Sequence, residues 1–257
     1  MGFRLSWRVV GASEVGSSHI SVNRDCEDSC WAQVGATASG MPFLQLFVAD
    51  GAGSALKGGV GADLAIQAAA NFIEKKLLLP EFGLNDALAI ECVMAVREKI
   101  YAAAEAQDMK ARDFACTFLG VLSCKLGTLV LQIGDGGVVL DVGHGLEVPV
   151  KPMSGEYANM THFVTDEDAV NMVVTKVFSG IAQRVAVFSD GLQRLALNMA
   201  DNTAHEPFFA SFFNVLANAT LEQDEQLHSA LIRFLQSPAV NDRTDDDKTL
   251  ALAVLSK

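Results

Sequence analysis

Segments typical of β-strands occur in two blocks along this sequence, and each block is followed by segments typical of helices. The first block, residues 5–50, holds four short runs rich in β-branched and aromatic residues, which Gly, Ser and Asn separate. Apolar residues at helical spacing then predict two long helices, over residues 59–79 and 85–106, and Pro80 ends the first. The four predicted strands of this block are residues 5–13, 17–22, 28–36 and 42–50.

The second block begins at residue 114 and extends to residue 150, where glycines punctuate a predicted meander of hairpins. A polar, irregular stretch over residues 151–168 separates it from two further predicted strands, residues 171–179 and 183–191. Helices are predicted after these strands, and an acidic loop leads into one last strand. The predicted helices span residues 192–199, 206–219 and 221–235.

This order of elements favours two packed sheets with helices outside them. In a doubly wound parallel sheet, strand and helix would alternate along the whole chain. The sequence therefore predicts an α+β fold. No linker and no internal repeat interrupts the 257 residues, so a single domain over residues 1–257 is expected.

Charge, hydropathy and cysteine content limit the partners and the compartment that we expect for this protein. The formal net charge is −12 and lysines and arginines form no cluster, so binding to a nucleic-acid backbone is disfavoured. No apolar run approaches the roughly 18 residues that cross a bilayer, and the first residues lack a signal-peptide stretch. Five cysteines without a paired C-x-x-C framework favour a reduced compartment. We expect a cytoplasmic protein without nucleic-acid or membrane partners.

The glycine-rich stretch FVADGAGSALKGGVGADLA, residues 47–65, allows two interpretations. It could be a phosphate-binding loop, or the glycines could frame a working aspartate. It contains neither G-x-x-x-x-G-K-[ST] nor a complete G-x-G-x-x-G, so a nucleotide-binding enzyme is the weaker alternative. The stretch does place Asp50 at the end of a predicted strand, followed directly by Gly51. We therefore interpret Asp50 as the working residue and the glycines as its frame.

Further acidic sites lie where predicted strands begin or end. Carboxylates gathered at one edge of a sheet cannot all stay ionised without cations. Oxygen-rich sites of this kind match hard divalent ions such as Mg²⁺ or Mn²⁺. The sequence thus indicates a divalent-cation site, which requires these strand ends to converge. The further sites are Asp135 in IGDGG, Asp190 in FSDGL, Asp245, Asp246 and Asp247 in TDDDKTL, and Glu27 with Asp28 in CEDSC.

The ordered series ED, ADGAG, IGDGG, FSDGL and DDKTL resembles the metal-dependent PPM/PP2C-type serine/threonine protein phosphatases, most closely their compact bacterial branch. The resemblance extends from about residue 11 to residue 255, nearly the whole chain. It implies an α-β-β-α sandwich of two mainly antiparallel sheets flanked by helices, with a two-metal site at one edge of the sheets. It also implies hydrolysis of phosphoserine and phosphothreonine in proteins, in opposition to a serine/threonine kinase.

The resemblance assigns the catalytic carboxylates by position. Asp50 would bridge two Mn²⁺ or Mg²⁺ ions, and the Gly51 carbonyl would help to hold one of them. Asp190 and Asp246 would complete the shell of the other ion. Asp247 is the alternative to Asp246, because the triple aspartate leaves the register open by one residue.

The resemblance also implies supporting acids around these ions. Glu27 and Asp28 would lie beside the second ion, partly through water. Asp135 matches an aspartate that in bacterial members can help to hold a third ion. The irregular polar stretch lies where the family carries its flap, which makes Asp166 and Asp168 candidate contacts there.

The charges of such a site imply the mechanism. A water activated by two ions would attack phosphorus in line, while the ions neutralise the phosphoryl oxygens. No covalent nucleophile is needed. We therefore expect no covalent role for Cys26 or Ser189.

The chain departs from the family on the substrate side. The family grips phosphate with an arginine three residues after a glycine, and here His19 stands at that spacing, with Arg24 as the alternative. Ala52 stands where other members carry a histidine that can act as a general acid, and Gly136 and Gly137 replace the polar pair of G-D-S-R. A pseudophosphatase that binds partners is therefore the alternative to an active phosphatase.

Overall fold

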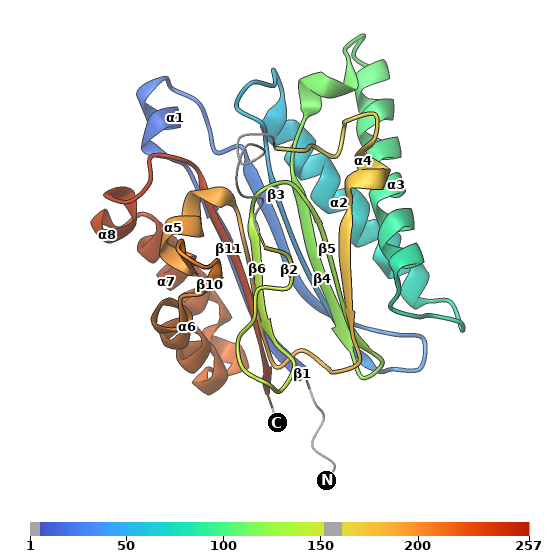
Figure 1. Ribbon diagram of the computed structural model, residues 1–257, viewed down its shortest axis with the longest axis vertical. Helices are drawn as coiled ribbons and strands as arrows, with labels where there is room; N and C mark the ends of the chain where they lie inside the picture. The colour runs from blue at the N-terminus through green and yellow to red at the C-terminus, as the bar shows by residue number, and fades with distance from the viewer. Residues whose placement is uncertain (1–5, 152–160, 257) are drawn as a thin grey trace.

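The computed structural model describes residues 6–151 and 161–256 of the chain. Its elements form four layers, with two β-sheets face to face and helices covering the outer face of each sheet (Figure 1). Every pair of neighbouring strands in the described residues is antiparallel. The predicted α-β-β-α sandwich is therefore confirmed.

One sheet has four strands and joins segments that are far apart in the sequence. Its strands are β1 (Ser6–Glu14), β6 (Gly137–Asp141), β8 (Arg184–Phe188) and β11 (Lys248–Ser256). Their order is β1-β11-β8-β6, so the first described strand pairs with the last. The two sequence blocks therefore do not correspond to the two sheets, because this sheet draws on both.

The other sheet has five strands, in the order β2-β3-β4-β5-β7. They are β2 (Asp28–Ala36), β3 (Pro42–Asp50), β4 (Phe118–Cys124), β5 (Gly127–Ile133) and β7 (Val174–Phe178). β4 and β5 are buried along their whole length. Apolar side chains from both sheets, such as Leu46 and Val187, fill the space between the sheets.

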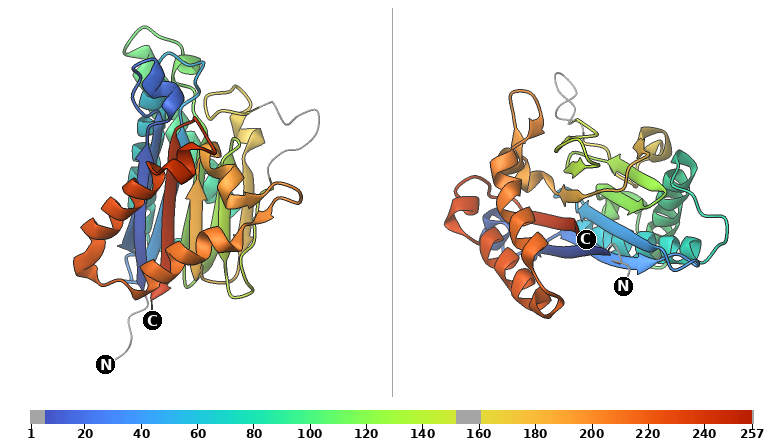
Figure 2. Two further views of the ribbon diagram at one scale, coloured as in Figure 1. Left: turned by 90° about the vertical axis from the view of Figure 1, so that its left-hand side faces the viewer. Right: turned by 90° about the horizontal axis from the view of Figure 1, so that it is seen from below.

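Four long helices cover the outer faces of the sheets. They are α2 (Gly58–Leu77), α3 (Asp86–Glu105), α6 (Glu206–Asn218) and α7 (Asp224–Leu235). α2 and α3 pack on the five-stranded sheet, and α6 and α7 pack on the four-stranded sheet (Figure 2). The predicted cap of α3 is present, because Asn85 Oδ1 accepts a hydrogen bond from the Leu88 N–H at 2.9 Å.

Residues 17–22 differ from the prediction of a strand. They form the short helix α1 (Ser17–Ser21), whose start is tied to the acidic loop before β11. The Ser18 N–H donates to the Asp245 carbonyl at 2.9 Å, and the Gly16 N–H donates to Asp247 Oδ1 at 2.6 Å. These contacts between distant segments override the local β-propensity.

Other short elements also differ from the prediction. The predicted helix over residues 192–199 is reduced to α5 (Gln193–Ala196), because the next residues pair as β9 (Leu197–Asn198) with β10 (Thr203–Ala204). Two one-turn helices were not predicted, and the first of them delays the start of β7. These are α4 (Ala169–Met172) and α8 (Pro238–Asn241).

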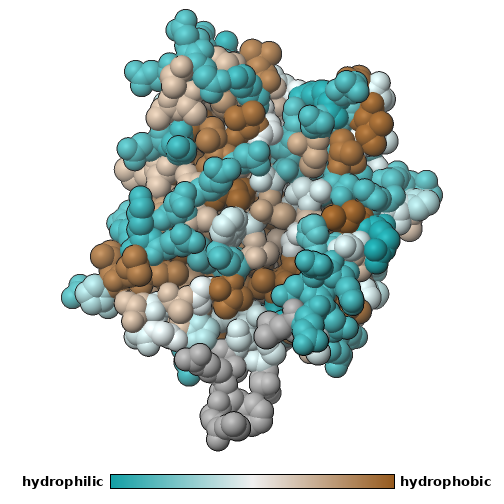
Figure 3. Space-filling model, turned by 180° about the vertical axis from the view of Figure 1, so that it is seen from behind, coloured by the Kyte–Doolittle hydropathy of each residue, from teal (hydrophilic) through white to brown (hydrophobic). Residues whose placement is uncertain are grey.

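Hydrophobic residues on the surface are scattered. The rear face carries several separate hydrophobic patches between hydrophilic residues (Figure 3). Leu78, Met94 and Val215 are examples of exposed apolar side chains from different helices or their ends. Within residues 6–151 and 161–256, no helix is both long and apolar enough to cross a membrane.

Acidic strand ends gather at the end of the sandwich opposite to the chain termini (Figure 1). β3 ends at Asp50, and Asp190 follows β8 after one residue. Asp135 lies in the turn between β5 and β6, and Asp246 lies just before β11. The sheets therefore bring together residues that are spread over almost 200 positions of sequence.

Candidate active site

A cavity of about 200 Å³ opens where these strand ends meet. The structure thus brings together most of the acidic sites predicted from the sequence. Its lining includes the Gly51–Gly53 turn and two residues of a later loop, Thr161 and Phe163. The carboxylates that line it are Asp50, Asp135, Asp190, Asp246 and Asp247.

Asp50 is held by main-chain contacts on both sides of β3. Its N–H donates to Thr117 Oγ1 at 3.0 Å, and the Thr117 N–H donates to its carbonyl at 2.8 Å. On the other side, the Gly51 N–H donates to the Glu27 carbonyl at 3.0 Å. These hydrogen bonds fix the backbone around Asp50.

Gly51 shows why glycines surround this aspartate. A Cβ at Gly51 would lie 2.3 Å from the Gly58 carbonyl carbon, so a larger residue would collide with the start of α2. A Cβ at Gly61 would lie 2.0 Å from the Phe114 carbonyl oxygen. These glycines permit close packing of backbone around Asp50, in agreement with the interpretation of the stretch as a frame.

A glycine next to Asp190 likewise lets its backbone pack closely against the segment before β11. A Cβ at Gly191 would lie 2.0 Å from the Asp247 carbonyl oxygen. Asp190 Oδ1 is buried and has no hydrogen-bond partner among the described residues. An orphaned carboxylate oxygen inside a polar cavity is costly unless a ligand satisfies it.

Burial and mutual repulsion raise the pKa of several of these carboxyls. Burial, and then the charges of Asp135 and Asp246, raise the pKa of Asp190 to about 6. Burial, followed by the charges of Asp28 and Asp190, raises the pKa of Asp50 well above its usual value. Among the described residues, no lysine or arginine forms an ion pair with Asp50, Asp190 or Asp246.

This donor set fits a hard divalent cation. It offers carboxylate oxygens that lack cationic partners, and a cation would relieve the repulsion that raises their pKa values. Within residues 6–151 and 161–256, no group of three Asp, Glu, His or Cys side chains is already close enough to hold an ion. Main-chain carbonyls and water would have to complete the coordination, as is common for Mg²⁺.

Asp135 faces the cavity from the turn after β5, and the loop after residue 160 covers it. Thr161 Oγ1 donates to Asp135 Oδ2 at 2.5 Å. Arg97 on α3 donates to the Val164 and Asp166 carbonyls, at 2.5 Å each, and so fastens this loop to the helix layer. No local pattern predicts this role for Arg97, since an arginine on a helix is usually a surface residue.

The acids predicted in the flap do not line the cavity. Asp166 Oδ2 accepts the Phe163 N–H at 2.9 Å, so this carboxylate closes a turn of the loop. Asp168 stands at the start of α4. The remainder of the predicted flap, residues 152–160, lies outside the described residues.

Glu27 and Asp28 lie behind the cavity rather than on its wall. Both carboxylate oxygens of Glu27 accept from Arg24 Nη2 at 2.6 Å. Asp28 Oδ2 accepts from Ser189 Oγ at 2.6 Å, while Asp28 Oδ1 is buried without a partner among the described residues. Burial raises the pKa of Asp28 to about 7, although the bonds from Ser189 and Thr249 lower it.

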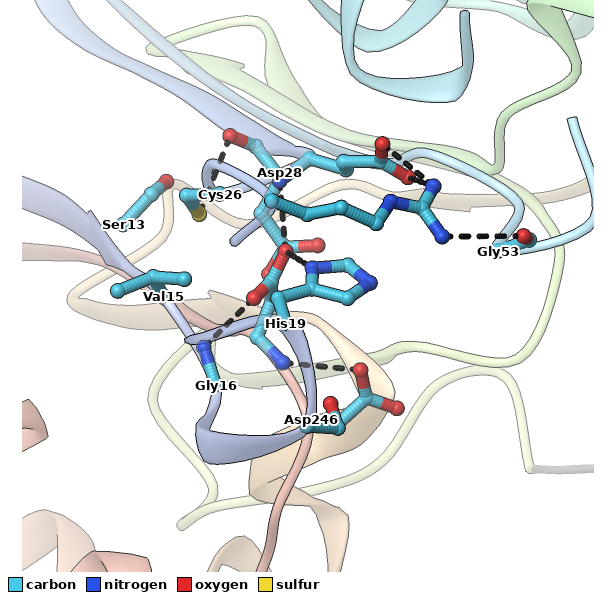
Figure 4. Close-up of polar contacts among 12 residues, drawn as sticks. Ser13, Val15, Gly16, His19, Cys26, Asp28, Gly53 and Asp246 are labelled. Atoms are coloured by element: carbon cyan, nitrogen blue, oxygen red, sulfur yellow. Dashed lines mark hydrogen bonds and ion pairs between the residues drawn. The ribbon is translucent and has the colours of Figure 1, made fainter. Parts of the chain in front are cut away.

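His19 and Arg24, the two candidates for the phosphate grip, are placed differently. His19 lines the cavity from α1, and its Nδ1 lies 2.9 Å from Asp247 Oδ2 (Figure 4). Arg24 does not line the cavity. Its guanidinium is held by Glu27 and lies 3.4 Å from the Gly53 carbonyl (Figure 4).

The contacts of Asp247 distinguish it from its neighbour Asp246. Asp247 Oδ1 accepts the Gly16 N–H at 2.6 Å, and Oδ2 accepts the Glu27 N–H at 2.6 Å besides its contact with His19. The Asp247 side chain is 3% exposed. Asp246 accepts only the Asp247 N–H, at 2.9 Å, and it is an exposed residue that lines the cavity, so it is the better placed to meet a ligand.

Cys26 and Ser189 are poorly placed for nucleophilic attack. Ser189 is fully buried and its hydroxyl donates to Asp28. Burial, then the charges of Asp28 and Asp247, raise the pKa of the Cys26 thiol, which disfavours the thiolate. Neither residue lines the cavity.

Comparisons with known proteins agree with this site and fold. The sequence profile described as Protein phosphatase 2C matches residues 15–235. Serine/threonine-protein phosphatase 3 of Escherichia coli (strain K12) is 56% identical over 250 residues, covering 97% of this chain and 99% of that protein.

Solved phosphatase structures share the fold at much lower identity. The catalytic domain of the serine/threonine protein phosphatase PstP, in complex with two manganese ions, gives a TM-score of 0.62 at 18% identity, covering 98% of this chain and 100% of that one. A serine/threonine phosphatase from Staphylococcus aureus gives 0.59 at 15% identity, covering 96% and 94%. At these identities the similarity establishes the fold.

Proposed function

Because this chain belongs to the protein phosphatase 2C family, we propose that it is a metal-dependent phosphatase that hydrolyses phosphoserine and phosphothreonine in proteins. The observation that carries the proposal is the cavity at the strand ends. There, Asp50, Asp190 and Asp246 are brought together without cationic partners among the described residues. The name of the 56% identical relative supports serine and threonine as the residues acted on.

The proposed cofactors are two Mn²⁺ or Mg²⁺ ions, and the manganese complex of PstP supports this choice. Asp50 and the Gly51 carbonyl, together with Asp190 and Asp246, would hold them, and Asp135 could hold a third. When bound, such ions lower the pKa of an attacking water and neutralise the phosphoryl oxygens.

The remaining acids act from behind the cavity. Asp28 binds Ser189 Oγ, which also accepts the Thr249 N–H at 3.0 Å, so it fixes the junction of β8 and β11. Glu27 restrains Arg24 at 2.6 Å, and we propose that it acts on an ion through water. Their proposed contribution to the metal site is therefore indirect.

His19 is the proposed contact for the substrate phosphoryl group, with Arg24 as the alternative. His19 already faces the cavity, whereas Arg24 would have to leave Glu27 to reach a substrate. A protonated imidazole can donate to phosphate oxygens, although it lacks the two-pronged geometry of arginine. The partner is a phosphorylated protein, so a serine/threonine kinase would supply the substrate.

The first experiment measures hydrolysis of phosphoserine and phosphothreonine peptides and of a small aryl phosphate. We expect turnover with Mn²⁺ or Mg²⁺, none with a chelator, and recovery when the cation is restored. Hydrolysis that survives the chelator would contradict the metal requirement. Binding of Mn²⁺ and phosphopeptide without any turnover would instead identify the protein as a pseudophosphatase that acts as a binding module.

A second experiment compares His19→Ala with Arg24→Ala at fixed pH and saturating cation. If His19 grips phosphate, His19→Ala raises KM for the aryl phosphate and leaves cation affinity nearly unchanged. If Arg24 does so, the increase in KM appears in Arg24→Ala instead. A change below about twofold in both variants, roughly 0.4 kcal/mol, would place the phosphate contact elsewhere.

A further inference from the structure

Lys248, the first residue of β11, is a buried lysine that the proposed mechanism does not use. It is 1% exposed and does not line the cavity. Its Nζ donates to the Val15 carbonyl at 2.9 Å and to Asn241 Oδ1 at 3.0 Å. Among the described residues, no carboxylate forms an ion pair with it. A lysine is rarely buried without a charged partner, because the ammonium group loses its water.

The two hydrogen bonds join three parts of the sequence. Val15 directly follows β1, and Asn241 is the last residue of α8. In the pairing of β1 with β11, Lys248 lies opposite Glu14. The lysine side chain therefore ties the start of β11 to the end of β1 on one side and to the end of α8 on the other.

The acidic loop before β11 is bound to residues 15–18 at two further points. The Ser18 N–H donates to the Asp245 carbonyl at 2.9 Å. The Gly16 N–H donates to Asp247 Oδ1 at 2.6 Å. Together with the bond from the lysine, these contacts hold the loop against the chain that follows β1.

Asp246 lies between these attachment points, and its carboxylate is left for the cavity. It lines the cavity and accepts a hydrogen bond only from the Asp247 N–H. Its main chain is closely packed, because a Cβ at Gly16 would lie 2.3 Å from the Asp246 carbonyl carbon. A shift of the start of β11 would therefore move this carboxylate, and a binding site requires its ligands to be held within about 0.5 Å.

We propose that Lys248 is a positioning residue for the metal site. Its two hydrogen bonds hold the start of β11 so that Asp246 presents its carboxylate to the cavity. The inference rests on the proposed metal-dependent function, and the lysine acts through the main chain without touching an ion or substrate. A positive charge near the site would also repel a metal ion, so the hydrogen bonds and the charge of the lysine have opposite effects on cation affinity.

These opposite signs give a test that does not depend on activity. Binding of Mn²⁺ to the metal-free protein is measured from the electron paramagnetic resonance signal of the free ion. Lys248→Met keeps an unbranched side chain but removes the donor. We expect the Kd for Mn²⁺ to rise about 10-fold or more, as when other groups that orient metal ligands are removed. A lower Kd would show that only the charge matters, and an unchanged Kd would limit Lys248 to the stability of the fold. Either result would overturn the proposal.

Asn241→Ala tests the hydrogen bond alone, because it removes one acceptor of Lys248 without a change in charge. Asn241 is exposed, so this variant is expected to fold even if Lys248→Met does not. We expect the Kd for Mn²⁺ to rise about twofold to fivefold. The matched control is Arg184→Met, which removes the contact with Asp141 at the other end of β8 from Asp190. An unchanged Kd in Asn241→Ala, or an equal rise in the control, would contradict the proposal.

A double variant tests whether Lys248 acts through Asp246. In the Asp246→Asn background, Lys248→Met should raise the Kd by less than about twofold, because the carboxylate that it positions is already lost. A rise as large as in the wild-type background would show that the two residues act independently and would overturn the proposal. Absence of Mn²⁺ binding to the wild-type protein would instead reject the proposed metal site, which separates the two hypotheses.

Discussion

Two aspartates at opposite ends of the sandwich end strands and precede glycine-rich turns, yet they differ in their polar partners. Asp141 ends β6, and its Oδ1 accepts the N–H groups of Gly143, His144 and Gly145 at 2.6 to 3.0 Å. Arg184 donates to its other oxygen at 2.6 Å. At the far end, Asp50 ends β3 without a cationic partner among the described residues.

The pKa values express this difference. Burial by itself would raise the pKa of Asp141, but the bonds from Arg184 and from the turn amides lower it below its usual value. The pKa values of Asp50 and Asp190 are raised, because burial is not compensated there. An aspartate before a glycine-rich turn is therefore structural where the fold supplies its partners, and available to a ligand where the fold withholds them.

The largest effect that would sharpen this contrast concerns catalysis. We expect Asp190→Asn or Asp246→Asn to lower kcat by about 100-fold to 1,000-fold or more while the fold persists, because each removes a charge proposed to hold an ion. Asp141→Asn should change kcat by less than about threefold. Steady-state kinetics at saturating Mn²⁺, with circular dichroism as the check on folding, make the comparison. Near wild-type turnover in either cavity variant would remove that residue from the proposed site.

The next effect concerns stability, where we expect the substitution at Asp141 to matter more than the substitution at Asp190. Asp141→Asn weakens the contact with Arg184 and with a turn, so we expect the free energy of unfolding to fall by about 2–3 kcal/mol. Asp190→Asn should cause no such loss in a chelator, because the charge it removes is unpartnered. Urea unfolding of both variants, with the exposed Asp242→Asn as control, tests this difference. Equal destabilisation by both variants would abolish the distinction between the two ends.

A smaller effect is expected in the pH dependence of stability without cations. Folding raises the pKa of Asp28 to about 7 and that of Asp190 to about 6, from the usual aspartate value of 3.8. Both carboxyls therefore bind protons more tightly in the folded chain than in the unfolded chain. Their stabilising contribution is therefore complete at acid pH and is lost as pH rises through about 6 to 7. Asp141 has the opposite sign, because its lowered pKa gives a contribution that is lost only as pH falls.

The pH dependence of stability is measured by thermal unfolding in a chelator between about pH 5 and pH 8. The melting temperature of the wild-type protein should fall as pH rises. In Asp190→Asn, the loss of unfolding free energy over this pH range should be smaller by roughly 1–2 kcal/mol. Asp141→Asn should leave the slope in this range unchanged. A slope that is identical in wild type and Asp190→Asn would mean that Asp190 does not carry the raised pKa.

The smallest expected effect is that of thiol reagents. Cys92, Cys116 and Cys124 are buried, and burial raises the pKa of Cys26 and Cys30, which disfavours their reactive thiolate forms. We expect phosphatase activity to stay within about twofold after treatment. Complete inactivation that persists in Cys26→Ser would indicate an essential thiol elsewhere.

The strand ends of this site could be predicted from sequence because each is marked locally. An apolar run, an aspartate and a glycine in succession identify Asp50, Asp135 and Asp190 without knowledge of the fold. The strand order could not be predicted in the same way, since β11 inserts between β1 and β8 by contacts that no local pattern records.

The substrate side was less predictable, because it depends on contacts between distant segments. The helix α1 forms where the sequence favours a strand, since its start bonds to the loop before β11. The choice between Asp246 and Asp247 depends on the register of that loop, because neighbouring side chains near a strand point in opposite directions. The position of Arg24 is set by Glu27, three residues away, which sequence spacing alone does not distinguish from a free arginine.

The position of β11 has a consequence for how the protein is made. Ser256 Oγ donates to the Ser6 carbonyl across 250 residues of sequence, so β1 leaves the ribosome long before its partner strand exists. Until then, the edge of β1 that will pair with β11 is open to other chains, and pairing over such a separation is slow. The loop before β11 also delivers Asp246 and the carboxylate that holds His19. On the proposed assignment of Asp246 to the metal site, a growing chain becomes active only when β11 docks, so completion of the fold and onset of activity are one event.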